Sequence, residues 1–164
     1  MGIMKGSSNR ASNTAGKLRK LAVPLDLHTA RQMIPLVISI VADIVGTRRR
    51  LGSLSPEQEV LDRNRRSLDW SNRQRRYRLR EEMAQAQSDL KRAETELAAL
   101  GLSLVDAEGG RIEFPTKING RPAAFSWQLG EDVLGFWHYS GEDLRRPIPS
   151  DWVKGAPIRH RREP

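Results

Sequence analysis

The stretch FSWQLGEDVLGFWHYSGEDLRRPI, residues 125–148, holds the side chains of this chain that are best suited to chemistry. Histidine side chains titrate near neutrality, so His138 has the properties of a general base. Tryptophan and arginine together offer an aromatic shelf with a cation, which suits an anionic small molecule or a peptide carboxylate. The candidate ligand-binding residues are Trp127, Glu131, Trp137, His138 and Arg146.

Catalysis by His138 would need a nucleophile or a substrate group within reach, and usually a further residue to orient the ring. The chain has no G-x-S-x-G elbow, no glycine-rich phosphate loop and no H-E-x-x-H helix. It has no cysteine, which excludes disulfides, thiolate metal sites and cysteine nucleophiles. We therefore assign no catalytic residue and no cofactor, and we favour a structural, hydrogen-bonded strand histidine over an enzyme.

A metal site at His138 would need carboxylates that converge on it from other parts of the chain. The candidates are Asp106, Glu113 and Glu131. None of them stands at the spacing of a metal-ligand motif, so we assign no metal ligand.

Trp127 also has a structural interpretation, because tryptophans at alternating strand positions commonly close the core between a sheet and a helix.

A second set of candidate residues lies in the arginine-rich segment 63–80, which holds eight arginines and one acidic residue. The candidate contacts for an anion or a nucleic acid are Arg66, Arg73, Arg76 and Arg80. Three of them are seven residues apart and so nearly in line on a helix, and two aromatic residues, Trp70 and Tyr77, stand among them. The alternative is a solvated helix face, which we favour because charge runs are usually solvated.

The net charge of +8 favours a nucleic-acid partner only until the charge is divided along the chain. Residues 1–22 hold five Lys or Arg residues and no acidic residue, whereas residues 101–164 hold nine of each sign. We interpret residues 1–22 as a disordered basic tail and residues 151–164 as a second basic tail. Binding of nucleic acid through the tail is therefore expected to be weak and nonspecific.

The apolar segments favour a cytoplasmic protein over a secreted or membrane protein. Residues 1–22 lack the continuous apolar stretch of a secretory signal, and the absence of cysteine suits a reducing compartment. The longest apolar run, residues 33–45, has thirteen residues and includes Ser39 and Asp43, whereas a membrane span needs roughly 20 residues. We expect this run to be buried in protein.

Two helices are predicted before the chain reaches residue 101. The predicted ranges are residues 26–51 for the first helix, 52–54 for a short link and 56–100 for the second helix. Asp26 is the predicted N-cap of the first helix, which is expected to bend near Pro35. Ser55 and Pro56 have the pattern of a second N-terminus, and the short link makes the helices antiparallel. A break near residues 69–72 would produce three helices.

The second helix carries a narrow apolar seam with the four-three spacing of a coiled coil. The seam residues are Leu79, Met83, Ala86, Leu90, Ala93, Leu97 and Leu100. At about 1.5 Å per residue, a first helix ending at Leu51 would cover only about residues 56–82 of the second. The uncovered part of the seam would need a partner, so we predict a homodimer through a coiled coil.

The residues after Gly101 change to the two-residue period of strands. Asn119-Gly120 is a strong hairpin signal because both turn positions tolerate positive φ. Alternation places His138 on the opposite face of its strand from Trp137. About four short antiparallel strands within residues 102–140 follow the helical hairpin, which predicts a single α+β domain over residues 23–150.

The order of motifs in the C-terminal half resembles the bacterial family known as domain of unknown function 2203. The matching positions are Phe114-Pro115, Gly120-Arg121, Trp127, Leu129-Gly130-Glu131, Phe136-Trp137-His138 and Arg146-Pro147-Ile148. The segment LDLHTARQMIPLV resembles the opening helix of the family, and the likeness covers about residues 24–150. Arg31 stands where the family tends to have Asn, and Ser126 stands where Cys is common. The resemblance implies a fold but no activity.

These observations lead to three hypotheses about function. The leading one is a non-catalytic binding or interaction module. One alternative is a protein that binds an anionic small molecule, or an enzyme, that uses the surface of Trp137, His138 and Arg146. The other is a nucleic-acid accessory protein that uses the basic tail and the arginine-rich helix.

Overall fold

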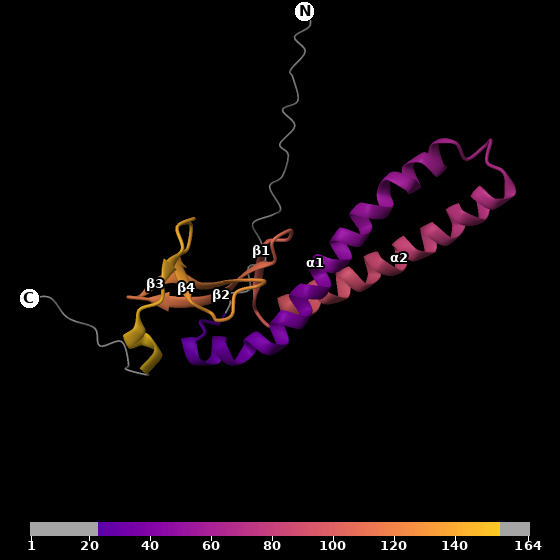
Figure 1. The fold of residues 1–164 in the computed structure, drawn as a ribbon. Helices are drawn as coiled ribbons and strands as arrows, with labels where there is room; N and C mark the ends of the chain where they lie inside the picture. Colours follow the sequence, from indigo (N-terminus) through magenta and orange to yellow (C-terminus); the bar gives the residue numbers. More distant parts are fainter. Residues whose placement is uncertain (1–22, 155–164) are drawn as a thin grey trace, which may run out of the picture.

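The computed structural model describes residues 23–154 and has a helical hairpin that projects from a small antiparallel sheet (Figure 1). Its elements are α1 (Leu27–Arg63), α2 (Trp70–Ala99), β1 (Ser103–Asp106), β2 (Arg111–Ile118), β3 (Arg121–Gln128), β4 (Phe136–Tyr139), β5 (Arg146–Pro147) and the 3-10 turn η2 (Ser150–Lys154). The predicted α+β class is confirmed, with five strands where about four were expected. The predicted tail 1–22 lies outside the described residues.

The N-terminus of α1 is capped as the sequence predicted. The Asp26 carboxylate accepts hydrogen bonds from the Thr29 backbone amide at 2.7 Å and from the Thr29 hydroxyl at 3.1 Å. These bonds satisfy an amide that has no partner inside the helix. Pro35 lies within α1, which bends in its N-terminal third, as expected of an internal proline (Figure 1).

The predicted link at residues 52–54 and the predicted cap at Ser55 are wrong, because α1 continues through them to Arg63. The Ser55 hydroxyl donates to the Leu51 carbonyl at 2.9 Å, as a serine does inside a helix. Pro56 leaves the carbonyl four residues before it, that of Gly52, without its helical partner. Packing against α2 offsets this loss, so the tertiary context overrides the local stop signals.

The helices separate at residues 64–69 instead, close to the break considered at residues 69–72. Asp69 caps α2 by accepting a hydrogen bond from the Asn72 amide at 2.8 Å. The structure thus has two helices, and α2 runs back along α1 toward the sheet (Figure 1).

The apolar seam of α2 packs within the same chain. Leu79, Ala86 and Leu97 are buried, and the seam residues Leu90, Ala93 and Leu100 pack against the main core. Because α1 reaches residue 63, it covers α2 over its length, and the uncovered seam on which the predicted dimer depended does not exist. The argument made for the homodimer no longer holds, and the homodimer itself stays a prediction.

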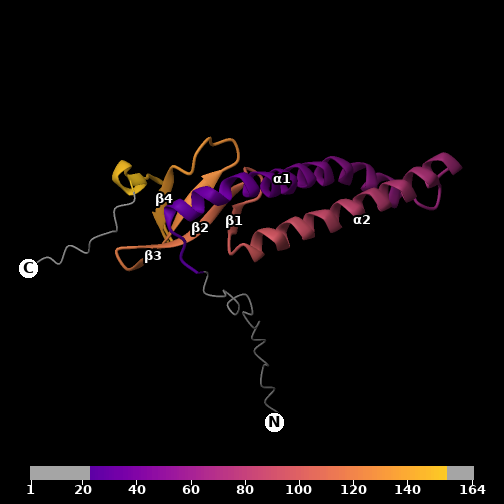
Figure 2. The ribbon, with the colours of Figure 1, turned by 90° about the horizontal axis from the view of Figure 1, so that it is seen from below.

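The sheet is a meander with the strand order β1-β2-β3-β4-β5, and every neighbouring pair is antiparallel. Asn119 and Gly120 have φ values of 53° and 74°, which confirms the predicted hairpin turn between β2 and β3. One face of the sheet lies on the N-terminal half of α1 (Figure 2). We call this the inner face; its buried residues include Ile112, Phe114, Phe125 and Trp127.

The apolar character of α1 follows from this packing. Val37, Val41 and Ile44 are fully buried in the core with the inner face of the sheet. An 18-residue window of α1 has a mean hydropathy of 1.4, so by length and composition alone α1 could also cross a membrane. Only 39% of that window is buried, and Leu36 and Ile38 are exposed at 50% and 40%. The predicted burial of residues 33–45 is therefore found on the side of α1 that faces the sheet and not on the side of Leu36 and Ile38.

The C-terminal boundary of the domain lies further along the chain than the predicted residue 150. Trp152, in η2, packs against the core and lies 5.4 Å from Trp137 between ring centroids. Residues 151–154 are therefore part of the folded unit and are not a tail. The rest of the predicted tail, residues 155–164, lies outside the described residues.

The continuity of α1 can be tested at Gly52. Gly52→Ala is expected to stabilise the protein by about 1 kcal/mol, because alanine is the better residue inside a helix and an added Cβ meets nothing within 4 Å. Gly101→Ala is the matched control, since its Cβ also meets open space but its φ is 78°. That variant should destabilise the protein by about 1–2 kcal/mol. Urea unfolding measures both, and loss of stability in Gly52→Ala would contradict a continuous helix.

Candidate functional site

The sheet divides the predicted ligand-binding residues between its two faces. Directly paired residues of antiparallel strands share a face, and His138 pairs with Ala124 whereas Trp137 pairs with Phe125. Trp137 therefore shares the inner face with Phe125, and His138 lies on the other face, which we call the outer face. The opposite orientation of Trp137 and His138 is confirmed, and it means that the two side chains do not form one surface.

On the outer face, the buried His138 pairs with Glu113, whose side chain is 26% exposed. Its Nε2 lies 2.9 Å from the Glu113 carboxylate, and its Nδ1 lies 2.9 Å from the Tyr139 carbonyl oxygen. Both ring nitrogens thus have oxygen partners. Of the three carboxylates considered for a metal site, Glu113 is the one that contacts His138. Within the described residues, no group of three or more His, Asp or Glu side chains is arranged to hold a metal ion.

Ser126 shares the outer face with this pair but does not join it. Ser126 pairs with Glu113 across β2 and β3, and it is 1% exposed. Its hydroxyl has no hydrogen-bond partner within the described part of the chain. Since both nitrogens of His138 are engaged elsewhere, the three side chains lack the serine–histidine hydrogen bond of a nucleophilic triad.

Glu131 closes the turn after β3. Its carboxylate accepts from the Gln128 backbone amide at 2.9 Å and from two nitrogens of Arg145, each at 2.9 Å. Its backbone carbonyl accepts from the indole nitrogen of Trp127 at 3.0 Å. Trp127 itself is 1% exposed and lies in the core. These two candidate residues are therefore engaged within the protein.

Arg146 lies with Trp137 at the edge of the inner face. The Arg146 guanidinium is 5.3 Å from the Trp137 ring centroid, and it forms an ion pair with Glu142. This ion pair lowers the pKa of Glu142 below its ordinary value. Tyr139 meets Trp137 edge-on at 5.1 Å. The arrangement joins β4, β5 and η2, and Trp137 and Arg146 are the part of the predicted shelf that the structure brings together.

The end of the helical hairpin farthest from the sheet forms a separate region, the hairpin tip, residues 62–80. Arg75 forms a two-point ion pair with Glu57 at 2.6 and 2.7 Å, and the Arg76 Nε lies 2.6 Å from the Asp62 carboxylate. These hydrogen bonds lower the pKa values of Glu57 and Asp62. Both pairs cross from α2 to α1 and hold the tip together. The candidate residue Arg76 is thereby engaged.

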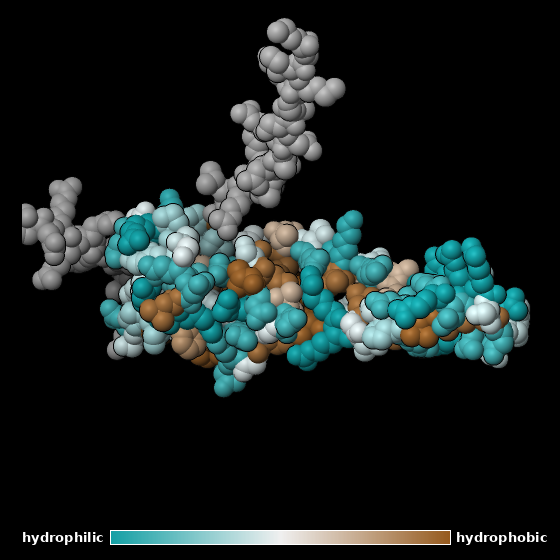
Figure 3. All heavy atoms as spheres, turned by 90° about the horizontal axis from the view of Figure 1, so that it is seen from above, coloured by the Kyte–Doolittle hydropathy of each residue, from teal (hydrophilic) through white to brown (hydrophobic). Residues whose placement is uncertain are grey.

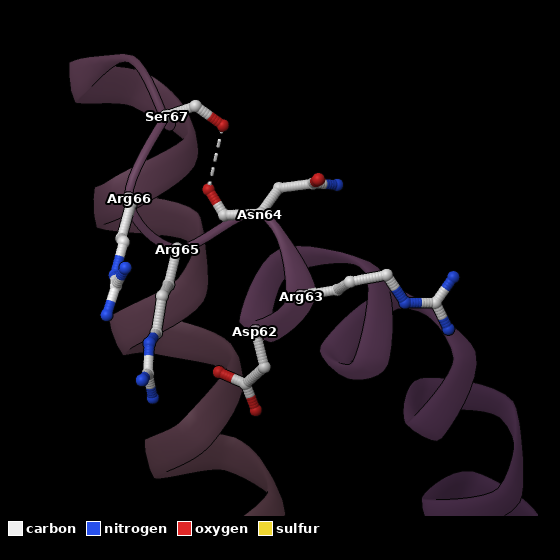
Figure 4. A pocket seen from close by; sticks show the side chains of 6 residues that line it. All are labelled: Asp62, Arg63, Asn64, Arg65, Arg66 and Ser67. Carbon is white, nitrogen blue, oxygen red and sulfur yellow. Dashed lines mark hydrogen bonds between the residues drawn. The ribbon is translucent and has the colours of Figure 1, made fainter.

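The other arginines of the hairpin tip form no ion pair with any described residue. They are Arg63, Arg65, Arg66, Arg73, Arg78 and Arg80. Arg66 lies in the turn before α2, so the predicted helical line of three arginines keeps only Arg73 and Arg80. Arg65 and Arg66 point the same way from the turn, whereas Arg63 points away from them (Figure 4).

The turn at the hairpin tip is hollowed. An open depression of about 390 Å³ is lined by residues 62–67, which include three of these arginines and one carboxylate, Asp62. Hydrophilic residues predominate at this end of the molecule, and hydrophobic residues gather where the hairpin meets the sheet (Figure 3). Trp70 and Tyr77 are nevertheless 68% and 63% exposed. The tip therefore combines unpaired cations with exposed aromatic rings.

Several residues of these arrangements were not predicted from the sequence. Arg145 gave no signal, because its partners are set by the path of a loop, and Ser126 was noted only as a departure from the family pattern. Arg65 would have been included among the candidate anion contacts if that set had been extended through the turn before α2. Arg31, on α1, was noted only as a departure from the family pattern; its guanidinium donates to the Leu134 carbonyl at 3.1 Å.

The pair on the outer face can be tested by a double-mutant cycle. Glu113→Ala should lower the free energy of unfolding by about 1–3 kcal/mol, since it leaves the buried His138 without this partner. His138→Ala should also lower it, since it leaves the partly exposed Glu113 carboxylate unpaired. The double variant should lose less than the sum of the two. Ser126→Ala is the control on the same face and should be neutral or stabilising, because its hydroxyl has no partner. Additive losses in chemical denaturation would show that the pair is not coupled.

The ion pairs of the hairpin tip predict acid sensitivity. A carboxylate with a lowered pKa stabilises the folded state above its unfolded pKa, and this contribution is lost as the pH falls through its folded pKa. The ordinary pKa values are 4.5 for Glu57 and 3.8 for Asp62, and both are lowered here. The unmodified protein should therefore lose stability below about pH 4.5. Glu57→Gln with Asp62→Asn should flatten the acid side of the melting temperature–pH curve; an unchanged slope would contradict the prediction.

The comparison with known proteins agrees with the motif order in the sequence. No curated protein and no solved structure matches the chain. The family of uncharacterized conserved proteins DUF2203 matches residues 25–148, which include α1, α2 and the whole sheet. This range covers most of the chain and all of the matching motifs, so the resemblance is confirmed: the chain belongs to the DUF2203 family.

Proposed function

We propose that this protein is a non-catalytic binding module that holds an anionic partner at the tip of its helical hairpin. The observation that carries the proposal is the group of six arginines at the tip that have no ion pair within the described residues. Arginine side chains without a carboxylate partner are available for phosphate or carboxylate groups, which they bind in a two-point geometry.

The ion pairs at the base of the tip support a preorganised site. Arg75 and Arg76 neutralise acidic residues of α1 and fix the two helices relative to each other. The remaining arginines then project from a rigid support, which reduces the entropy lost on binding. The depression lined by residues 62–67 adds a concave surface, and its volume is about 390 Å³.

A non-catalytic role is supported by the state of the outer face. The two nitrogens of His138 have oxygen partners, and the Glu131 carboxylate is engaged by Arg145 and a backbone amide. A general base needs a free nitrogen or carboxylate oxygen directed at a substrate. The proposed anionic-ligand surface of Trp137, His138 and Arg146 is not retained, since His138 lies across the sheet from the other two.

The proposal can be tested with inorganic polyphosphate and a single-stranded oligonucleotide as polyanions. Arg73→Glu with Arg80→Glu should weaken binding at least tenfold in titration calorimetry. Lys91→Glu with Lys117→Glu is the matched control, because both lysines are exposed, both lie outside the tip, and the change in charge is the same. The affinity should also fall as salt rises, with a log–log slope of roughly 0.7 per phosphate contact on a single strand.

Two results would overturn the proposal. One is the absence of binding to either polyanion at low salt. The other is an equal loss of affinity in the two double variants, which would mean that net charge acts without a site. Circular dichroism of both variants checks that the helices are intact.

A further inference from the structure

We infer that the anionic partner is a single-stranded nucleic acid whose bases stack on Trp70 and Tyr77. This inference rests on the proposed function and adds the class of partner. The first observation is exposure: the two rings are 68% and 63% exposed, and they lie at the hairpin tip among arginines that have no ion pair with a described residue.

The two rings share one face of α2. They are seven residues apart, close to two helical turns, which places them about 10 Å apart along the helix axis. Leu79 and Ala86, on the opposite side of the helix, are buried. Trp70 and Tyr77 therefore point away from α1 into solvent, where neither contributes to the core.

Each ring has an arginine three residues after it. Arg73 follows Trp70 and Arg80 follows Tyr77, and residues three apart are neighbours on a helix surface. The face thus repeats a unit of one ring and one cation. Arg73 donates from its Nε to the Asp69 carbonyl at 3.4 Å, and neither arginine has a carboxylate partner among residues 23–154. Glu81 follows directly and limits the face to two units.

This repeat fits the chemistry of a single strand. Proteins that bind single strands combine cations along the phosphate backbone with aromatic rings on which bases stack. The separation of about 10 Å corresponds to three nucleotide steps at roughly 3.4 Å each. In a duplex the base faces are already stacked and paired, so the rings could add little there. Polyphosphate has no bases and could use only the arginines.

The test compares nucleic acids that offer unpaired bases for stacking with nucleic acids that do not. Oligothymidylate of about twenty nucleotides, the matching oligouridylate, an abasic strand of the same length and the corresponding duplex are titrated against the full chain. The unmodified protein should bind the two base-carrying strands at least tenfold more tightly than the abasic strand. If oligothymidylate binds more tightly than oligouridylate, the preferred partner is DNA; if oligouridylate binds more tightly, it is RNA.

The variants connect that preference to the rings. Trp70→Ala with Tyr77→Ala should remove the preference for bases and leave the affinity for the abasic strand unchanged. Trp70→Phe with Tyr77→Phe should retain most of the preference, because phenylalanine still offers a ring. Binding of oligothymidylate should quench tryptophan fluorescence, and this quenching should be absent in Trp70→Phe.

The outcomes separate the two proposals. Equal binding of the base-carrying and abasic strands would overturn the inference while leaving the anion site intact. Binding to none of the strands or to polyphosphate would overturn both. The inference would also be overturned if phosphatidylserine–phosphatidylcholine vesicles bound more tightly than every strand and this binding depended on Trp70 and Tyr77. That result would identify an anionic membrane surface as the partner.

Discussion

The continuous helix α1 is the constraint on which the rest of the structure depends, because one rod supports both the sheet and α2. Its N-terminal half buries Val37, Val41 and Ile44 with the inner face of the sheet, and its C-terminal half buries Leu61 and carries the acidic partners of Arg75 and Arg76. At about 1.5 Å per residue, its 37 residues extend over about 55 Å. A helix that ended near Gly52 would leave the hairpin tip without a support.

Local signals in the sequence were sufficient where a feature depends on neighbouring residues alone. The Asp26 cap and the Asn119-Gly120 turn are both present, and three residues of the predicted seam of α2, Leu79, Ala86 and Leu97, are buried. The link at residues 52–54 was predicted wrongly because the prediction relied on local residues alone. Gly52, Ser55 and Pro56 form a typical stop and start, but packing against α2 offsets the cost of one missing backbone bond. The contacts that join this part of α1 to α2 span 18 positions at Glu57–Arg75 and 32 at Arg50–Glu82.

The candidate site was predictable in its residue types and not in its contacts. Alternation correctly separated His138 from Trp137, but the partner of His138 depends on the register of three strands. Glu113 reaches His138 across β3, and neither residue carries a spacing signal for the other. A one-residue slip in any of these pairings would turn the side chains to the opposite face. Register is fixed by burial of the whole inner face, a global property that no short motif expresses.

The fold separates the family motifs from the proposed binding region. The motifs of the C-terminal half lie between Phe114 and Ile148 in the sheet, where Trp127, Glu131 and His138 are engaged in internal contacts. The hairpin tip lies at the far end of α2, about 30 Å or more from the sheet by the 1.5 Å rise per residue. Charges at that distance are screened in physiological salt, where the Debye length is about 8 Å. The family model matches both regions, since residues 25–148 include the sheet, the two helices and the hairpin tip. The exposed arginines and aromatic rings proposed for binding are therefore part of the matched domain but lie apart from the internal contacts of the sheet motifs.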